Sequence, residues 1–139
     1  MAEYQKPLPI PNEDTKPFWD SLKEHKLKIQ KCRQCGQFRF PPRVICPHCM
    51  SVESQWVEVK GVGTVYSFTI VHHAYTPAYE SEVPYVVAIV ELEEGTRLIS
   101  NIIGCKPEQV QIGMPVELAF EDVTPEFTLH RFRPMTPPP

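Results

Sequence analysis

The chain has 139 residues, a formal net charge of −3 and 42% hydrophobic residues, which is enough for one domain with a core of its own. No apolar run approaches the roughly 20 residues of a membrane-spanning helix, and the first residues lack the apolar segment of a secretory signal. Cysteines in a chain without an export signal favour metal binding over disulfides and a reducing compartment. We therefore expect a cytoplasmic protein without membrane contact.

The N-terminal segment predicts an extended arm followed by a short helix. Prolines at three alternate positions within residues 7–11 favour a polyproline-like conformation. Thr15 is placed to cap a helix over residues 16–25, with a proline tolerated in its first turn. Phe18 and Trp19 give this helix an aromatic stripe. The stripe either packs against the rest of the chain or docks on another protein.

Two Cys-x-x-Cys pairs, ten residues apart, dominate the next segment. They supply Cys32, Cys35, Cys46 and Cys49. Such pairs bring four thiolates to one tetrahedral ion, either zinc or the iron of a rubredoxin-type redox module. Gly36 follows the first pair and suits a left-handed turn, but the second pair lacks an equivalent glycine, which favours zinc. A closed four-sulfur site leaves no open coordination position, so we predict one structural Zn²⁺.

Alternating β patterns follow the second cysteine pair. The predicted strands cover residues 56–60, 64–71, 85–92, 97–103, 115–120 and 127–132, with a short helical turn within 106–113. In the strand at 64–71, Tyr66, Phe68 and Ile70 are predicted on one face and Val65 on the other. Three strands, a short helix and two more strands is the order of a five-stranded OB-fold barrel.

We therefore predict a mainly β protein in four parts. These are an N-terminal arm and helix (1–26), a rubredoxin-like zinc ribbon (27–53), an OB-fold barrel with one short helix (54–133) and a proline-rich tail (134–139).

This order of parts resembles the acyl-CoA-associated proteins that accompany thiolase-superfamily enzymes in bacteria and archaea. The stretches that carry the resemblance are Lys31–Gly36, Arg39–Arg43, Cys46–Cys49, Gly61–Thr69, Pro84–Ala88, Glu94-Gly95, Ile103-Gly104 and Ile112–Val116. No single motif among them is very specific, but their order is, and it covers roughly residues 16–132.

The resemblance implies a non-catalytic accessory subunit of a thiolase-type acyl-CoA C-acyltransferase complex. The partner would carry the catalytic residues for thiolytic or retro-aldol cleavage, or for condensation. This chain would stabilise the partner and help to form the channel for the CoA thioester, in a hetero-oligomer with two copies of each subunit. We accordingly expect no catalytic residue here. Cys105 follows an apolar strand without a base nearby and is predicted to pack in the core.

Two groups of residues are candidates for contacts with a ligand or partner. Arg39 and Arg43 are suited to the phosphates of CoA, or they offset the anionic metal site. The second group lies in the long loop 72–84 and consists of His72, His73, Tyr75 and Tyr79. Long loops in compact domains are often functional, so we predict an interface or channel-lining role for them, with a plain loop as the alternative.

The alternative function is that of a nucleic-acid-binding zinc-ribbon and OB-fold protein. Binding to phosphates ordinarily demands a basic excess. Here four thiolates on one divalent ion add two negative charges to the formal −3. We therefore expect no nucleic-acid partner.

Overall fold

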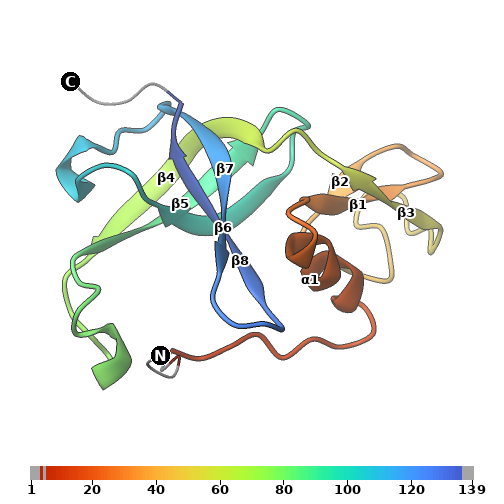
Figure 1. The fold of residues 1–139 in the computed structure, drawn as a ribbon. Helices are drawn as coiled ribbons and strands as arrows, with labels where there is room; N and C mark the ends of the chain where they lie inside the picture. Colours follow the sequence, from red (N-terminus) through yellow and green to blue (C-terminus); the bar gives the residue numbers. More distant parts are fainter. Residues whose placement is uncertain (1–3, 5, 136–139) are drawn as a thin grey trace.

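A computed structural model describes residue 4 and residues 6–135 (Figure 1). Its elements are α1 (Lys16–Lys23), β1 (Lys28–Cys32), β2 (Phe38–Arg39), β3 (Ser54–Glu58), β4 (Val62–Val71), β5 (Tyr85–Leu92), β6 (Arg97–Ile102), β7 (Pro115–Asp122), β8 (Thr128–Pro134) and two short 3₁₀ helices, η1 (Pro77–Tyr79) and η2 (Pro107–Gln109). The predicted fold class is confirmed: one α-helix, a cysteine-bearing ribbon and a closed five-stranded barrel. The part of the predicted tail beyond residue 135 lies outside the described residues.

Helix α1 begins where the sequence predicts and ends two residues earlier. Thr15 occupies the capping position, but its side chain makes no capping hydrogen bond to the first turn. Its hydroxyl instead accepts from the backbone N–H of Asn12, 3.0 Å away. The Asn12 side-chain oxygen in turn accepts from the backbone N–H groups of Asp14 and Thr15, both at 2.9 Å. A turn just ahead of the helix therefore fixes how the arm enters it.

The ribbon is a three-stranded antiparallel sheet in the order β2-β1-β3. We predicted the strand near residues 56–60 for the barrel, but β3 pairs with β1 along its whole length, from Lys28↔Glu58 to Cys32↔Ser54. The reason is that β2 pairs on the opposite side of β1, through Gln30 and Lys31, and leaves one edge of β1 open. Beta3 fills that edge and then leads directly into the barrel.

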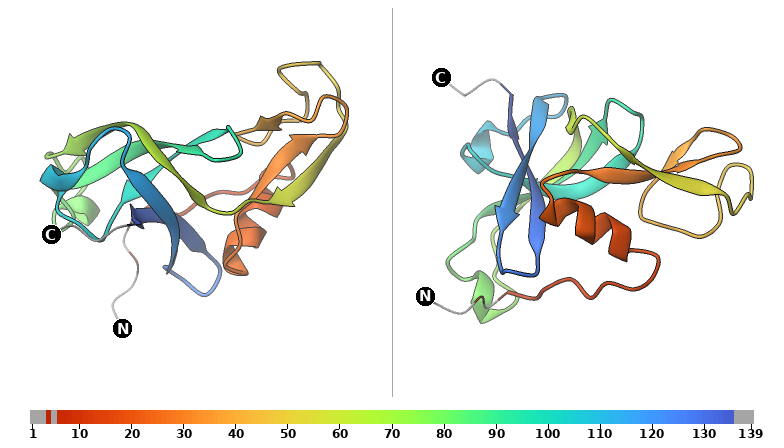
Figure 2. Two further views of the ribbon diagram at one scale, coloured as in Figure 1. Left: turned by 90° about the horizontal axis from the view of Figure 1, so that it is seen from above. Right: turned by 45° about the vertical axis from the view of Figure 1, so that its right-hand side comes forward.

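The barrel closes in the order β4-β5-β6-β8-β7, with β7 returning to pair with β4. Alternate residues of β5 are buried, as a half-buried strand requires. The seam between β6 and β8 is parallel, with Ile102↔Phe132 as its one position of strand pairing. The two strands separate on one side of this pair. Figures 1 and 2 show the two strands crossing and then diverging, with α1 beside β8.

The predicted faces of β4 are wrong at two positions, Val65 and Tyr66, because the strand carries a bulge. Its register against β5 shifts between Val65 and Ser67. Val65 is 1% exposed, whereas Tyr66 is 47% exposed. Phe68 and Ile70 pack against the core on the same side as Val65. An extra residue in one strand reverses the alternation beyond it, so Val65 and Tyr66 exchange their predicted faces.

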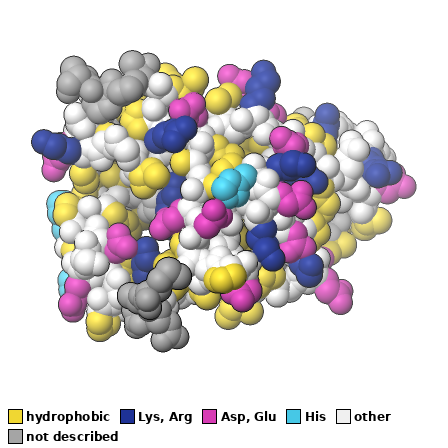
Figure 3. Space-filling view, in the orientation of Figure 1, with side chains coloured by type: hydrophobic (Ala, Val, Ile, Leu, Met, Phe, Trp, Pro, Cys, Tyr) yellow, Lys and Arg dark blue, Asp and Glu magenta, His cyan; other side chains and the backbone are white. Residues whose placement is uncertain are grey.

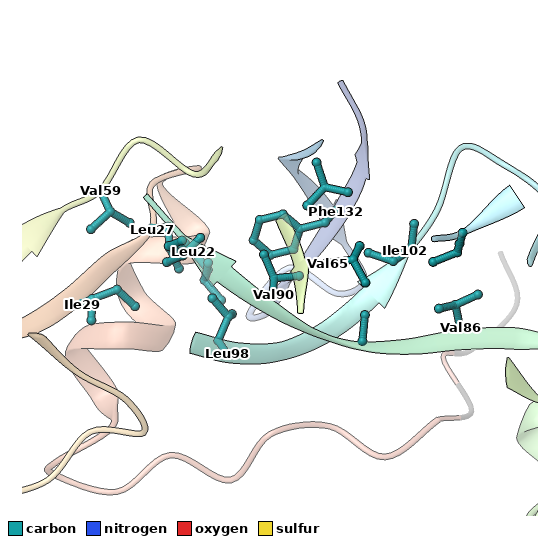
Figure 4. Packing of buried hydrophobic residues seen from close by; sticks show 14 of the residues in the cluster. Leu22, Leu27, Ile29, Val59, Val65, Val86, Val90, Leu98, Ile102 and Phe132 are labelled. Atoms are coloured by element: carbon teal, nitrogen blue, oxygen red, sulfur yellow. The ribbon is translucent and has the colours of Figure 1, made fainter. Parts of the chain in front are cut away.

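One hydrophobic core connects the ribbon, the helix and the barrel (Figure 4). Ile29 and Val59 lie at the ribbon end, and Leu22 and Leu27 lie between them and Leu98 of β6. Phe132 is fully buried inside the barrel, close to Val90 and Val65. The parts named from the sequence therefore share a single packed interior. In the described part of the chain, no helix has the length and apolar character needed to cross a membrane.

Candidate metal centre and surface sites

The four predicted cysteines converge at one end of the ribbon. Their sulfur atoms all lie within 4.8 Å of one another. Cys32 Sγ is 3.5 Å from Cys49 Sγ, and Cys35 Sγ is 3.6 Å from Cys46 Sγ. Sulfurs bound to a tetrahedral zinc at ~2.3 Å are separated by roughly 3.8 Å. The donor set and its spacing thus fit zinc.

The local surroundings of these sulfurs shift the pKa values of the thiols in opposite directions. The backbone N–H of Cys35 is the largest cause that lowers the pKa of Cys32 to about 6. At Cys49 the N–H of Ser51 acts in the same direction, but desolvation and the three neighbouring sulfurs outweigh it and raise the pKa to about 12. Four thiolates therefore do not coexist here without a positive charge among them. A divalent ion held by these four residues would supply that charge and favour the deprotonated form of the remaining thiols.

The aromatic stripe of α1 is divided between the core and the surface. Phe18 is 2% exposed and contacts Trp19, Phe40 and His130 with ring centroids 5.0 to 5.9 Å apart. Its ring therefore follows the first of the two alternatives, packing against the rest of the chain, and leaves no surface for a partner. Trp19 is half-buried and lies in the wall of a groove.

The two predicted arginines have different surroundings. Arg39 is 3% exposed, and its Nε donates to the backbone oxygen of Arg43 at 3.0 Å. It holds the loop between the cysteine pairs in place. Arg43 is exposed and borders a hollow of about 330 Å³ between the ribbon and the β5–β6 turn, together with His48 and Arg97. Among the described residues, Arg43 has no ion-pair partner, whereas Arg97 Nε lies 2.9 Å from Glu91.

The residues predicted in the loop 72–84 do not form a single cluster. His72 and His73 are exposed, and the His73 ring contacts Tyr75 edge-on with centroids 4.7 Å apart. Tyr75 is 82% exposed. Tyr79, in η1, turns the other way and packs against Tyr85, with centroids 5.7 Å apart. Of these four residues, Tyr79 borders the same groove as Trp19.

That groove, about 590 Å³ in volume, is the site that sequence reasoning missed. It opens where β6 and β8 separate, and its walls come from β5, β6, β8, α1 and the loop before β5. The apolar lining consists of Trp19, Tyr79, Tyr85, Val87, Ile99, Ile102, Ile103 and Leu129. Ser100 and His130 contribute polar groups from facing strands. No local pattern joins Ser100 to His130, because they are 30 residues apart in the chain.

Charges over the molecule are mixed. Figure 3 shows Lys and Arg interspersed with Asp and Glu on the face it presents, without a continuous basic area. Many of the basic side chains lie in ion pairs, including Lys16–Asp20, Arg131–Glu121 and Arg133–Glu117. These features do not favour a nucleic-acid surface.

Comparison with known proteins identifies the family. The family described as "ChsH2, rubredoxin-like zinc ribbon domain" matches residues 19–53, and "ChsH2, C-terminal OB-fold domain" matches residues 56–121. A DUF35 domain-containing scaffold protein of Methanocaldococcus jannaschii is 43% identical over 107 residues, which cover 76% of this chain and 75% of that protein. The chain belongs to the DUF35 family. The four-sulfur cluster of this DUF35 chain is accordingly a structural zinc site.

Other relatives of this DUF35 chain are named as subunits of acyl-CoA enzymes. A probable enoyl-CoA hydratase alpha subunit of Thermomonospora curvata is 46% identical over 132 residues, which are 95% of this chain but 41% of that protein. The chain therefore spans less than half of that relative. The benzoylsuccinyl-CoA thiolase subunit BbsA of Geobacter metallireducens is 33% identical over 78 residues, which are 56% of this chain and 51% of that subunit.

A solved structure extends the similarity to three dimensions. A chain described as "Ltp2-ChsH2(DUF35) aldolase" is 45% identical, with a TM-score of 0.85. The match covers 93% of this chain and 100% of that chain.

Proposed function

We propose that this DUF35 chain is a non-catalytic accessory subunit of a thiolase-type acyl-CoA enzyme. It stabilises the catalytic subunit and forms part of the channel for the CoA thioester, in an assembly with two copies of each subunit. The observation that carries the proposal is the similarity, at 45% identity, to the whole of the DUF35 chain in an aldolase. A relative named as a thiolase subunit gives further support.

The chemistry of the described residues supports an accessory role. The four cysteines close a metal site without an open coordination position. Ser100 is 5% exposed, and its hydroxyl lies within hydrogen-bond distance of the ring and backbone oxygen of His130. Ser100 is buried, and among the described residues no carboxylate bonds to the other ring nitrogen of His130. The pair is therefore poorly suited to nucleophilic catalysis. We therefore assign the bond chemistry to the partner.

The hollow beside Arg43 is our candidate for the phosphates of CoA. Arg43 is exposed and unpaired by carboxylates among the described residues, and the Arg39 guanidinium fixes the backbone of its loop. A guanidinium held on a fixed loop suits recognition of phosphate oxygens. Arg39 itself contributes through the loop, because its side chain is buried.

Native purification of the untagged protein tests the proposed function. We expect a thiolase-superfamily subunit to co-elute, and we expect turnover of a CoA thioester by the pair to exceed that of the large subunit alone. Cleanly separating the two and finding the large subunit fully active and stable would refute the accessory role. A parallel preparation with Arg33→Gln, an exposed substitution outside both hollows, controls for loss of the complex during handling.

A further inference from the structure

The groove between β6 and β8 carries no uncompensated charge. It is bordered by four charged residues that form two ion pairs. Lys6 Nζ lies 2.9 Å from Glu82, and Arg131 Nε lies 3.0 Å from Glu121. The side chains of Lys6 and Arg131 are each only 15% exposed, so both cations are largely withdrawn from solvent as well as paired. An ionised ligand would therefore lose its hydration without finding a free counter-charge.

Polar groups lie in the middle of this otherwise apolar surface. Ser100 Oγ lies 2.8 Å from Nδ1 of His130. The hydroxyl also lies 3.1 Å from the backbone oxygen of His130, which can only accept. If Ser100 donates to Nδ1, the neutral imidazole carries its proton on Nε2; if Ser100 donates to the backbone oxygen, the proton is on Nδ1 and Nε2 is an acceptor. Among the described residues, nothing bonds to Nε2, and the ring borders the groove. Nε2 can therefore donate to a ligand oxygen in the first tautomer and accept from a ligand hydroxyl in the second.

The position in the fold is also that of a ligand site. In OB-folds, the face of the second and third strands and the loop after the first strand are the surface that binds oligonucleotides and oligosaccharides. Here these are β5, β6 and the loop 72–84, and the groove lies on all three. Its volume of about 590 Å³ is within the range of pockets that bind small molecules.

We propose that this groove binds the uncharged acyl part of a thioester. Its hydrocarbon chain would lie on the apolar wall of Trp19, Val87 and Ile99, and one of its oxygens would bind at His130 Nε2. The choice of an acyl ligand rests on the proposed function, while the requirement for an uncharged ligand rests on the groove alone. The site is separate from the hollow beside Arg43, so the two ends of a long thioester would be recognised by different parts of the chain.

Trp19 provides a direct readout of binding. The chain has two tryptophans, Trp19 and Trp56, so Trp56→Phe leaves a single indole in the groove wall. We would titrate this zinc-loaded protein with the thioester S-octanoyl-N-acetylcysteamine, with octanoate and with N-acetylcysteamine. We expect a saturable fluorescence change with the thioester and binding at least about tenfold weaker with octanoate. N-acetylcysteamine, which lacks the acyl chain, should cause no change. Calorimetry on the unmodified protein repeats the measurement without the Trp56 substitution.

A pair of exposed isoleucines supplies the matched variants. Ile99 is 63% exposed and lies in the groove, whereas Ile112 is 70% exposed and lies outside it. Ile99→Asp places a charge on the apolar wall and should weaken thioester binding at least about tenfold, while Ile112→Asp should leave it unchanged. Equal effects of the two variants, or no saturable binding in either method, would overturn the proposal.

Co-elution of the large subunit, measured beside probe binding, distinguishes failure of the groove proposal from failure of the proposed accessory role. If Ile99→Asp prevents co-elution of the large subunit and no probe binds, the groove is a protein contact and the acyl assignment fails, while the accessory role stands. If the probe binds and Ile99→Asp weakens it, but no acyl-CoA enzyme co-elutes, the groove assignment stands and the accessory role fails.

Discussion

Ser100 Oγ lies 2.8 Å from Nδ1 of His130 and joins β6 to β8 just where the two strands begin to separate. Desolvation, with the nearby positive charge of Arg131 as a smaller cause, lowers the pKa of His130 to about 4. The imidazole is therefore neutral in the folded protein at neutral pH. The burial of this imidazole makes the stability of the barrel depend on pH.

The first prediction concerns that dependence. Between pH 6.5 and 4 the unfolded chain protonates His130 but the folded chain does not, so the free energy of unfolding falls as the pH falls through this range. A shift from 6.5 to about 4 corresponds to about 3 kcal/mol. Urea unfolding of zinc-loaded protein at several pH values, compared with His130→Gln, isolates this contribution. The variant should show a shallower dependence, and parallel curves would contradict our account.

Glu121 and Glu82 also border the groove, and Lys6 and Arg131 pair with them. These four residues are present both in the unmodified protein and in His130→Gln, so their titration cancels when the two are compared. Zinc release at low pH must be followed with a chromophoric chelator, since thiolates compete with protons for the metal. Only pH values at which both proteins keep zinc enter the comparison.

The second prediction concerns the metal. Cys46→Ser removes one ligand from a buried position and should abolish stoichiometric zinc binding. Because the ribbon shares its core with the barrel, we expect a lower midpoint of unfolding for the whole chain and loss of partner binding. Elemental analysis, thermal unfolding and co-elution measure the three effects. Cys105→Ser, at the remaining cysteine, is the control and should keep its zinc. Full partner binding by the metal-free variant would show that the ribbon makes no essential contact.

The third prediction separates steric from conformational requirements for glycine. A methyl group at Gly63 would overlap the backbone oxygen of Glu91 on the neighbouring strand β5, so Gly63→Ala should destabilise the protein by about 2–3 kcal/mol. Gly95 has φ +95° and open space around it, so Gly95→Ala should cost only the backbone strain, about 1 kcal/mol. Chemical denaturation measures both. A larger loss at Gly95 than at Gly63 would show that strand contact does not limit residue 63.

The fourth prediction addresses the phosphates of CoA. Arg43→Gln removes an exposed guanidinium from the hollow and should weaken CoA binding by the assembled complex about tenfold. Arg33→Gln also removes an exposed arginine from the ribbon, but outside the hollow, and should have no such effect. Calorimetric titration with CoA compares them. An equal loss in both variants would indicate a general charge effect, which added salt would also reduce.

The sequence predicts those features that depend on local patterns. Paired cysteines at fixed spacing predict the metal cluster, and the nearly continuous apolar run at residues 85–92 predicts the strand β5. The features that it misses depend on contacts between distant residues. Beta3 joins the ribbon because one edge of β1 is open, and Tyr66 faces outward because of a bulge. The groove arises because β6 and β8 diverge on the side of the Ile102↔Phe132 pair that holds Ser100 and His130, which no single segment encodes.

The N-terminal arm has a consequence for fusions to this protein. Lys6 is held by Glu82, and its ammonium group lies 5.8 Å from the centre of the Tyr79 ring. In Figure 1 the arm runs from this end, near η1, to α1. Lys6 borders the groove, so residues added ahead of the arm would join the chain a few positions before it, whereas β8 ends at the other side of the barrel. To keep added residues away from Lys6 at the groove, the tests above require a tag at the C-terminus or none.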